Sequence, residues 1–144
     1  MNDERVLEYA RDMGKVLQLV NIARDIVTDS ETLGRCYVPY EYLKDARNEL
    51  RILKNERHAS TINEHQLHSY SLRLLQLAET FNSNVIKGIS CLPHDVQRQL
   101  LVLYHIYKSI GIKIKQSTQY KQRIYLNTFQ RILIAFKYLY FHLN

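Results

Sequence analysis

Residues 18–39 of the chain read QLVNIARDIVTDSETLGRCYVP. The first part of this stretch continues a series of apolar residues at helical spacing, namely Val6, Ala10, Met13, Leu17 and Val20. Such spacing predicts a helix, which we place over residues 3–29. We expect a loop over residues 30–39, where Gly34 can adopt a positive φ at low cost. A first helix of this length favours an all-α protein.

The rest of the sequence repeats helical signals and shows no strand-like stretch or internal repeat. Further helices are expected over residues 40–45, 48–54, 61–87, 93–115 and 120–142. The capping box Thr61-x-x-Glu64 predicts the start of the longest of these, and Gly88 predicts its C-terminal cap. Pro93 fits the first turn of the following helix. We therefore predict an all-α fold that forms part of a helical bundle.

The composition is that of a folded domain or part of one. The chain has 144 residues, of which 46% are hydrophobic and 24% are charged, so a packed core is expected. The formal net charge is +6. A positive net charge favours binding to nucleic acid, to an anionic membrane surface or to a phosphorylated substrate. Basic and aromatic residues do not alternate along one face, so we expect no nucleic acid partner.

Cysteine spacing and targeting signals indicate the cellular compartment of the protein. Cys36 and Cys91 lack C-x-x-C spacing, which predicts free thiols in a reducing, intracellular compartment. We recognise no signal peptide, and no apolar run reaches the ~18 residues of a membrane span. Residues 132–143 come nearest, but Lys137 and His142 interrupt them. We expect a buried terminal helix there, in a cytoplasmic or membrane-associated protein, and contact with a membrane surface is the alternative.

Four polar residues form a line along the first predicted helix. Gln18, Asn21, Asp25 and Asp29 are separated by three, four and four positions, so they share one face at about 3.6 residues per turn. Gly14 lies on the same line one turn earlier. Its missing side chain leaves room for a ligand or for another backbone. A solvated helix face is the simpler interpretation of such a short pattern.

The two aspartates of this line need a positive partner. Carboxylates four positions apart on a helix repel each other by roughly a few tenths of a kcal/mol. Arg24 is adjacent in sequence, but we expect it to point about 100° away from Asp25. A hard cation suits the site better, because Mg²⁺ prefers oxygen ligands and commonly bridges carboxylates to phosphate groups. Asn21 adds an amide oxygen, and Gln18 can hydrogen-bond a water or a phosphate.

The predicted loop after the helix adds Arg35 and Tyr37 close behind the last carboxylate. Arginine binds diphosphates well, because its planar guanidinium matches two phosphate oxygens at once. An arginine that follows a glycine is, by itself, an ordinary surface residue. Together with the line of polar residues, however, Arg35 favours a site for an anion and a metal ion.

Taken as one motif, these residues resemble a known family signature. The pattern Q-x-x-N-x-x-R-D-x-x-x-D followed by G-R-x-Y-x-P, over residues 18–39, is similar to the second aspartate-rich motif of squalene and phytoene synthases. The string LQLVNIARDI over residues 17–26 resembles phytoene synthases, in particular the fungal type fused behind a membrane-embedded lycopene cyclase. The later part of the chain resembles the last helices of the family, but less specifically. The residues that carry this weaker resemblance are Cys91-Leu-Pro93, Arg98, IYKSIGIKI (residues 106–114) and Tyr120-x-x-Arg123.

The resemblance implies roles for individual residues. Asn21, Asp25 and Asp29 would bind Mg²⁺, with Mn²⁺ as an alternative, and the two aspartates would act in catalysis with Arg35. Binding of the substrate diphosphate would involve Gln18, Asn21, Arg24, Arg35, Tyr37 and Tyr104. Because aromatic residues at helical spacing usually belong to the core, packing is the competing interpretation of both tyrosines.

The implied reaction is the Mg²⁺-dependent head-to-head condensation of two geranylgeranyl diphosphates to phytoene in carotenoid biosynthesis. Ionisation of an allylic diphosphate becomes easier when metal ions and arginine stabilise the departing charge. The carbocation then needs an apolar, aromatic cavity that excludes water. Only the second aspartate-rich motif is present, so we interpret residues 1–144 as the C-terminal half of the domain. We expect this chain to be inactive without the N-terminal half, and a fused lycopene cyclase is a further expected partner.

Two other functions fit the same sequence. The first is squalene synthesis within the same family, which also requires NADPH. The second is a non-enzymatic, family-like helical protein that serves in assembly or interaction. Relatives of that kind usually lose the aspartates. The presence of Asp25 and Asp29 therefore favours an enzyme.

Overall fold

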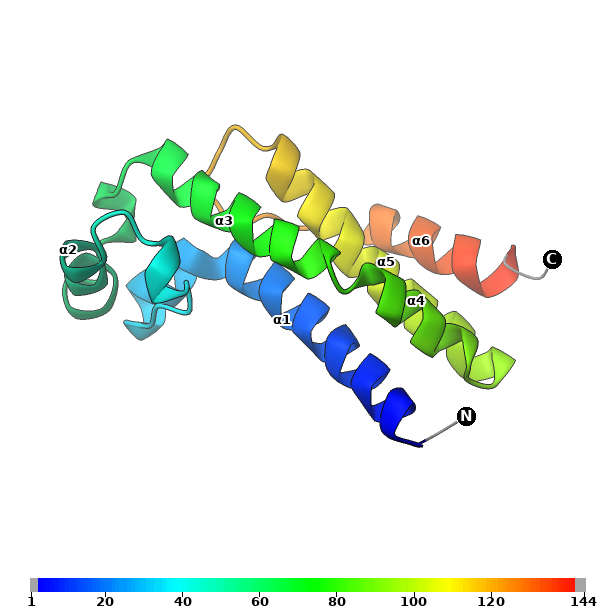
Figure 1. Cartoon of the computed structure of the whole chain (residues 1–144). Coiled ribbons are helices and arrows are strands. Elements are labelled where there is room, and N and C mark those ends of the chain that lie inside the picture. Colours follow the sequence, from blue (N-terminus) through cyan, green and yellow to red (C-terminus); the bar gives the residue numbers. More distant parts are fainter. Residues whose placement is uncertain (1–2, 142–144) are drawn as a thin grey trace.

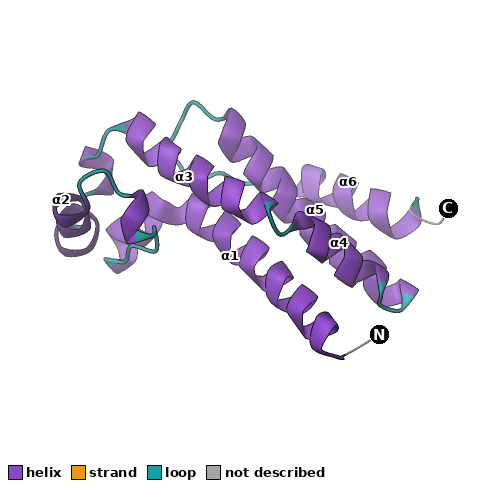
Figure 2. Cartoon of the chain, in the orientation of Figure 1, coloured by secondary structure: helices purple, strands orange, loops and turns teal. Residues whose placement is uncertain are grey.

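The computed structural model describes residues 3–141 and contains helices and loops in that range (Figure 2). Its α-helices are α1 (Asp3–Leu33), α2 (Ala46–Leu50), α3 (Glu64–Glu79), α4 (Asn82–Ser90), α5 (His94–Gln116) and α6 (Thr128–Tyr140). Short helical turns of other pitch flank α2, namely η1 (Tyr40–Tyr42), η2 (Arg51–Glu56) and η3 (Ala59–Thr61). No described residue lies in a strand, so the predicted all-α class is confirmed.

The helices form an elongated bundle (Figure 1). Helices α3 and α4 run back along α1, α5 returns beside them, and α6 lies against α5 near the end of the bundle that holds both termini. Helix α2 and the short turns lie at the opposite end. Contacts join α1 to α3, α4 and α5, whereas α6 contacts mainly α5. The first helix is therefore the element around which the rest of the bundle is arranged.

The core lies along one face of α1, on which Val16, Val20 and Ala23 are each at most 4% exposed. The larger core cluster joins α1, α3 and α5 and includes Val20, Ala23, Leu74, Leu75 and Ile110. A smaller cluster near the start of α1 contains Val16, Val85, Ile89 and Tyr104. Burial of such side chains stabilises by about 1.5–3 kcal/mol each. This packing fixes the rotation of α1 and leaves its opposite face for other contacts.

The helix predicted over residues 61–87 is divided into α3 and α4 by a turn at residues 80–81. Gly88 lies inside α4, so its predicted role as a C-terminal cap is wrong. A Cβ atom on Gly88 would lie only 2.5 Å from the Cβ of Tyr9. The glycine is therefore required by the close approach of α4 to α1 rather than by the end of a helix.

The start of α3 also differs from the predicted capping box. Asn63 is the N-terminal cap, and its side-chain oxygen accepts hydrogen bonds from the backbone N–H groups of His65 and Gln66. Thr61 belongs to η3 instead, where its hydroxyl donates to the His58 carbonyl. Asparagine and threonine both cap helices well. The sequence offers both within three positions, and the structure uses the asparagine.

The first helix continues four residues beyond its predicted end, so residues 30–33 are helical rather than part of the loop. The next residue, Gly34, has a φ of +61°, which confirms the expected positive φ at this position. The Gly34 N–H donates to the Ser30 carbonyl at 2.9 Å, which is the bond of a left-handed C-terminal cap. A Cβ atom on Gly34 would lie 2.7 Å from Nε of Arg57, because the end of η2 packs against this turn.

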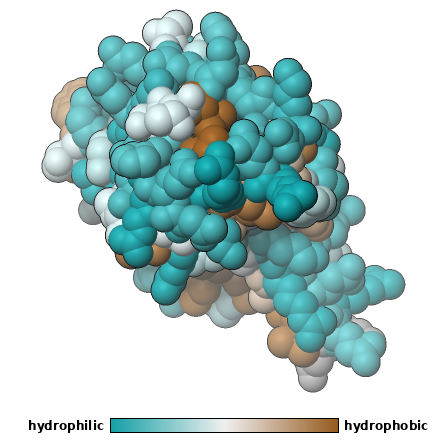
Figure 3. All heavy atoms as spheres, turned by 90° about the vertical axis from the view of Figure 1, so that its left-hand side faces the viewer, coloured by the Kyte–Doolittle hydropathy of each residue, from teal (hydrophilic) through white to brown (hydrophobic). Residues whose placement is uncertain are grey.

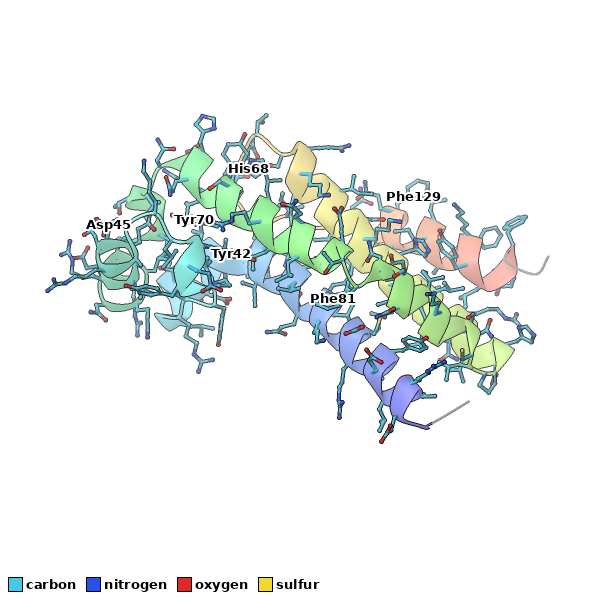
Figure 4. All side chains as sticks on the ribbon, viewed as in Figure 1. Tyr42, Asp45, His68, Tyr70, Phe81 and Phe129 are labelled. Carbon is cyan, nitrogen blue, oxygen red and sulfur yellow. The ribbon has the colours of Figure 1, made fainter. Side chains whose placement is uncertain are left out.

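The predicted short helices are present with shifted bounds, as η1 and as α2 followed by η2. Asp45 caps α2 by accepting from the Asn48 N–H. The hydroxyl of Tyr70, a residue that is 1% exposed, lies 2.7 and 2.9 Å from the two carboxylate oxygens of Glu49. Figure 4 shows Asp45 and Tyr70 at this end of the bundle. These bonds hold α2 against α3.

The last helix is shorter and less buried than predicted. It begins at Thr128 rather than at residue 120, because Asn127 and Gln130 form a capping box. No residue of α6 is buried, so the expectation of a buried terminal helix is wrong for the described part. Residues 142 and 143 of that prediction lie outside the described range. Every helix within residues 3–141 is too short or too polar to cross a bilayer.

Candidate functional site

The predicted polar line lies on the face of α1 roughly opposite its core-facing side. Gln18 is exposed, Asn21 and Asp29 are half-buried, and Asp25 is only 8% exposed. A Cβ atom on Gly14 would meet nothing within 4 Å. The line therefore begins on an open surface and becomes buried at Asp25, although this face does not point into the core.

Arg24 forms a two-point ion pair with Asp25. Its Nε donates to Oδ1 at 2.8 Å and its Nη2 donates to Oδ2 at 2.7 Å. The expectation that Arg24 would point away from Asp25 is therefore wrong. The two Cα–Cβ bonds do diverge by about 100°, but the long arginine side chain turns back around the helix. Its two N–H groups match the two carboxylate oxygens.

Arg123 reaches the same carboxylate from the connector between α5 and α6, residues 117–127. Its Nε lies 2.7 Å from Oδ1 of Asp25, and its Nη2 donates to Oδ2 at 3.2 Å across 98 positions of sequence. The Arg123 guanidinium also lies over the ring of Tyr125, 5.2 Å from its centroid. Two guanidinium groups therefore enclose Asp25, which explains why a carboxylate on this face is almost inaccessible to solvent.

The two aspartates have pKa values shifted in opposite directions. Burial opposes the ionisation of Asp25, but the hydrogen bonds from Arg24 and the charges of Arg24 and Arg123 outweigh it and hold the pKa below its usual value. Burial and the neighbouring Asp25 carboxylate raise the pKa of Asp29. Within the described chain, the Asp29 side chain has no hydrogen bond or ion pair. Asp29 is therefore the carboxylate that remains open to a cation.

The side-chain oxygen of Asn21 is buried and has no hydrogen-bond partner within residues 3–141. A buried acceptor without a partner costs about 1–3 kcal/mol, so native proteins seldom keep one without a ligand or a water. This oxygen lies on the same line as Asp25 and Asp29. Amide and carboxylate oxygens are donors that Mg²⁺ accepts, so the three residues fit the predicted metal ion.

The described residues offer only part of a metal coordination shell. Within residues 3–141, no group of three or more His, Cys, Asp and Glu side chains is arranged to hold a metal ion. Mg²⁺ prefers octahedral coordination and usually keeps waters or shares phosphate oxygens. A metal ion here would therefore take further oxygens from a phosphate group, from water or from another part of the protein.

The loop after α1 brings Arg35 to the end of the polar line. Nη1 of Arg35 donates to the Tyr37 hydroxyl at 3.2 Å, and both residues are exposed. The charge of Arg35 acts on the pKa of Asp29, which it lowers against the larger effect of burial. With Arg24 and Arg123, three guanidinium groups surround two carboxylates. The site therefore keeps an excess positive charge even when both aspartates are ionised.

Buried hydrogen bonds fix the C-terminal half of α1 in this orientation. Ser30 is 0% exposed, and its hydroxyl donates to the Leu53 carbonyl of η2 at 2.7 Å. Ser71 of α3 donates from its hydroxyl to the Ala23 carbonyl at 2.7 Å. A net contribution of about 1 kcal/mol is typical of such bonds. They hold the helix from two sides, so the polar line faces away from α3.

Tyr104 lies in the core, away from this group. Its side chain is 2% exposed and packs in the smaller cluster with Val16, Val85 and Ile89. It borders a cavity of about 60 Å³ between α1, α3 and α5, and burial raises its pKa. Tyr107 and Tyr125 are the tyrosines close enough to Arg24 to influence its pKa. The assignment of Tyr104 to the diphosphate site stays a prediction.

Arg123 is the site residue that the sequence motif did not include. The pattern Tyr120-x-x-Arg123 resembles the end of the family sequence, but it gives no sign of a contact with Asp25. An open hollow of about 380 Å³ borders Arg123 and is also lined by Lys113, Gln116, Gln119, Gln122 and Tyr125. Two cations and several amide groups line it, so its chemistry suits an anion.

Comparison with known proteins identifies the family. Residues 1–130 match the squalene/phytoene synthase profile. The chain belongs to the squalene/phytoene synthase family, as the resemblance predicted. The bifunctional lycopene cyclase/phytoene synthase of Blakeslea trispora is 41% identical over 135 residues, 93% of this chain and 22% of that protein. The phytoene synthase of Pseudescherichia vulneris is 37% identical over 115 residues, 80% of this chain and 35% of that protein.

The chain corresponds to only part of each relative. The 15-cis-phytoene synthase of Pantoea ananas is 34% identical over 119 residues, 83% of this chain and 37% of that protein. The chain thus spans between 22% and 37% of the length of the three relatives. No solved structure shows a significant match. Family membership agrees with the all-helical bundle, since the family has an isoprenoid-synthase-type helical fold.

Proposed function

We propose that this chain supplies the second diphosphate-binding wall of a phytoene synthase, which joins two geranylgeranyl diphosphates head to head. The main support is the grouping of Asp25, Asp29 and the unpaired Asn21 oxygen beside Arg24 and Arg123. Carboxylate and amide oxygens suit a divalent cation, and guanidinium groups suit a diphosphate. The names of the relatives, phytoene synthase and 15-cis-phytoene synthase, support the same reaction.

Each residue of the site has a role in this proposal. Asn21, Asp25 and Asp29 would hold Mg²⁺, or Mn²⁺, near the substrate diphosphate. The bound ion supplies Lewis-acid stabilisation of the negative charge that develops on the leaving group. The diphosphate itself is bound by Gln18, Arg24, Arg35, Tyr37 and Arg123. Cleavage of the allylic C–O bond leaves its electron pair on pyrophosphate, where these donors stabilise it.

Asp25 is already paired with Arg24 and Arg123, so substrate binding exchanges partners at this point. A diphosphate is more highly charged than a carboxylate and accepts the same bidentate guanidinium contacts. If Arg24 and Arg123 turned to the phosphate oxygens, the Asp25 carboxylate would be free to help hold the metal ion. The exchange leaves neither the carboxylate nor the guanidinium groups without a partner, which a buried charge requires.

The allylic cation needs apolar surroundings that exclude water. Tyr104, Val16 and Val20 border a small cavity at the core side of α1, which is the face opposite the polar line, so this cavity is not assigned to the cation. We assign the other aspartate-rich wall and the apolar cavity beside the polar line to the preceding half of a complete domain. A fused lycopene cyclase is part of the proposal only because relatives with that name match this chain.

Activity of a completed domain tests the proposal. The chain is joined to the preceding half of a phytoene synthase, and conversion of geranylgeranyl diphosphate to phytoene is measured with and without Mg²⁺. Asp25→Asn should lower the rate by about 10² or more. Asp45→Asn is the matched control, because Asp45 is exposed, makes no contact with the polar line and can be replaced by Asn, which also caps helices. Unchanged phytoene formation by Asp25→Asn would exclude the proposed role.

Product analysis separates the proposal from its alternatives. Squalene synthesis belongs to the same family, and it requires NADPH, whereas phytoene formation does not. Radiolabelled products formed with and without NADPH therefore distinguish the two reactions. If the completed, folded bundle binds no prenyl diphosphate in the presence of Mg²⁺, a non-enzymatic role in assembly or interaction is favoured instead.

A further inference from the structure

Arg123 reaches Asp25 from a segment without regular structure. Residues 117–127, the connector between α5 and α6, lie outside any helix or strand. The Arg123 side chain is itself 35% exposed. A long side chain on irregular backbone has many rotamers to lose, and an ion pair that solvent reaches contributes little order by itself. The contact with Asp25 therefore depends on what fixes the path of the connector.

Tyr120 attaches the connector to α3. Its ring stacks on the ring of His68, with 4.1 Å between centroids and 17° between planes, and the ring of His65 lies 5.6 Å from it. Figure 4 shows His68 on α3, near the end of α5 where the connector begins. Tyr120 precedes Arg123 by three positions. The stack therefore fixes the backbone just before the arginine.

The His68 ring is held in place by α5. Its Nε2 lies 3.1 Å from the carbonyl oxygen of Ile114, a residue of the last turn of α5 that is 4% exposed. A carbonyl only accepts hydrogen bonds, so this nitrogen carries a hydrogen and donates it. His68, Tyr120 and Arg24 border the same cavity of about 20 Å³. The stack thus lies directly beside the arginines that enclose Asp25.

Other contacts hold the connector after Arg123. Ile124 packs against the main core cluster, and Leu126 belongs to that cluster and is 6% exposed. Nζ of Lys113 donates to the Tyr125 carbonyl at 2.8 Å. Arg123 therefore lies between two attached points of the connector. The later point is part of the core, whereas the earlier point is the aromatic stack.

An ion pair beside the stack offers a comparison. Nζ of Lys121 lies 3.5 Å from Oε1 of Glu64, and the two side chains are 36% and 50% exposed. Hydrophilic residues cover most of the surface at the end of the bundle from which α3 starts (Figure 3). An exposed pair on such a surface contributes little to stability. The stack, rather than this pair, is the contact that can restrain the connector.

We propose that the stack of Tyr120 on His68 positions the Arg123 guanidinium at Asp25. The two rings act on the site through Arg123, so they are positioning residues rather than catalytic ones. Loss of either ring frees the connector before Arg123 and lowers the fraction of time that the guanidinium spends on the carboxylate. The consequence for catalysis rests on the proposed function, in which Arg123 binds the diphosphate. The positioning itself does not.

NMR of the full chain tests the positioning without any substrate. A guanidinium turns about its Nε–Cζ bond only after its hydrogen bonds break, so the rotation rate of Arg123 reports how often it leaves Asp25. Tyr120→Leu removes one ring and should raise this rate about threefold to tenfold. His68→Gln removes the other ring, keeps an N–H donor and should have the same effect. Rotation of Arg24 should change little, because Arg24 reaches Asp25 from α1 itself.

Two further variants serve as controls. Tyr120→Phe keeps the ring and should retain the rotation rate of the unmodified chain. Lys121→Gln removes only the exposed ion pair and should leave the rotation of Arg123 unchanged. Equal rotation rates of Arg123 in the unmodified chain, Tyr120→Leu and His68→Gln would overturn the proposal. Equal acceleration of Arg24 and Arg123 would also overturn it, because that result indicates a general loosening of the fold.

Phytoene formation by a completed domain gives an independent measurement. Tyr120→Leu should lower kcat/KM about threefold to tenfold. Added to Arg123→Gln, it should lower kcat/KM no further, because both changes act through the same guanidinium. Additive losses would overturn the positioning role. A completed, unmodified domain that forms no phytoene would contradict the proposed function, and the rotation rates would then still decide the role of Tyr120.

Discussion

Asp25 and Asp29 are one helical turn apart but have different electrostatic surroundings. Asp25 receives hydrogen bonds from Arg24 and Arg123, and its pKa lies below the usual value. The pKa of Asp29 lies above the usual value because of burial and the charge of Asp25. The two residues therefore change the stability of the fold in opposite senses as the pH changes.

Replacement of Arg123 should raise the pKa of Asp25 toward its ordinary value. Because folding lowers this pKa, Asp25 contributes stability above the pKa of the unfolded chain, and that stability is lost as the pH falls through the folded value. Arg123→Gln should reduce the free energy of unfolding at neutral pH by about 1 kcal/mol. Carboxyl NMR during acid titration gives the pKa. Arg131→Gln is the control, and an equal effect of both variants would contradict the assignment.

The substitution Asp29→Asn should change the free energy of unfolding in the opposite direction to Arg123→Gln. Its raised pKa means that its stabilising contribution is present below the unfolded pKa and is lost as the pH rises through the folded value. In metal-free protein the variant should therefore be more stable than the parent at about pH 7, by roughly a few tenths of a kcal/mol. The gain should vanish near pH 3, below both pKa values. Thermal unfolding at the two pH values, with chelator, measures it. A loss of stability at neutral pH would contradict the prediction.

Asn21→Leu should stabilise the chain and remove its affinity for metal and diphosphate. The replaced oxygen is buried without a partner within residues 3–141, so an apolar side chain of similar shape should raise the free energy of unfolding by about 1 kcal/mol. Asn84→Leu is the matched control, because Nδ2 of Asn84 donates to Asp12 at 2.8 Å and its loss should destabilise. Denaturant unfolding compares the two. Destabilisation by both variants would show that Asn21 has a structural partner.

At the scale of helices, the glycines of α1 and α4 distinguish a free face from a packed one. A Cβ atom added to Gly14 would meet nothing within 4 Å, whereas one added to Gly88 would lie 2.5 Å from the Cβ of Tyr9. Both glycines lie inside helices, where alanine has the higher intrinsic propensity. The tertiary contact therefore decides the sign of each substitution.

Gly14→Ala should stabilise the chain by up to about 1 kcal/mol through helix propensity. Gly88→Ala should destabilise it by roughly 1–3 kcal/mol, because α4 must move away from Tyr9. Midpoints of thermal unfolding should therefore shift in opposite directions. If Gly88→Ala were stabilising, the close approach of α4 to Tyr9 of α1 would be wrong.

Local signals predicted the existence of the main helices better than their ends. The periodicity of apolar residues was sufficient for α1, α3 and α5, since each buries one face. The ends depend on choices between near-equal signals, such as Asn63 over Thr61 at the start of α3. The prediction that Gly88 caps a helix was wrong, because the sequence alone does not distinguish a capping glycine from one required by close packing. Only the position of Tyr9 distinguishes them.

At the scale of the whole molecule, the site combines one local and one distant contribution. The polar line follows from the spacing of residues on α1, so the sequence predicts it directly. The contact of Arg123 with Asp25 spans 98 positions, and no local rule gives it. The ion pair of Arg24 with Asp25 could not be predicted from the sequence either, because the direction of a Cα–Cβ bond does not determine where a long side chain ends.

If the proposed function is correct, the enclosure of Asp25 by two arginines should link the binding of the metal ion and the diphosphate thermodynamically. A diphosphate that draws Arg24 and Arg123 away frees the carboxylate, so it should strengthen metal binding, and by reciprocity the metal should strengthen diphosphate binding by the same factor. Calorimetry on a completed domain should show tighter Mg²⁺ binding with pyrophosphate than without it. Part of this cooperativity should disappear in Arg123→Gln, whose Asp25 is less tightly held. Such a site would bind the metal ion alone more weakly than it binds the metal ion together with the diphosphate.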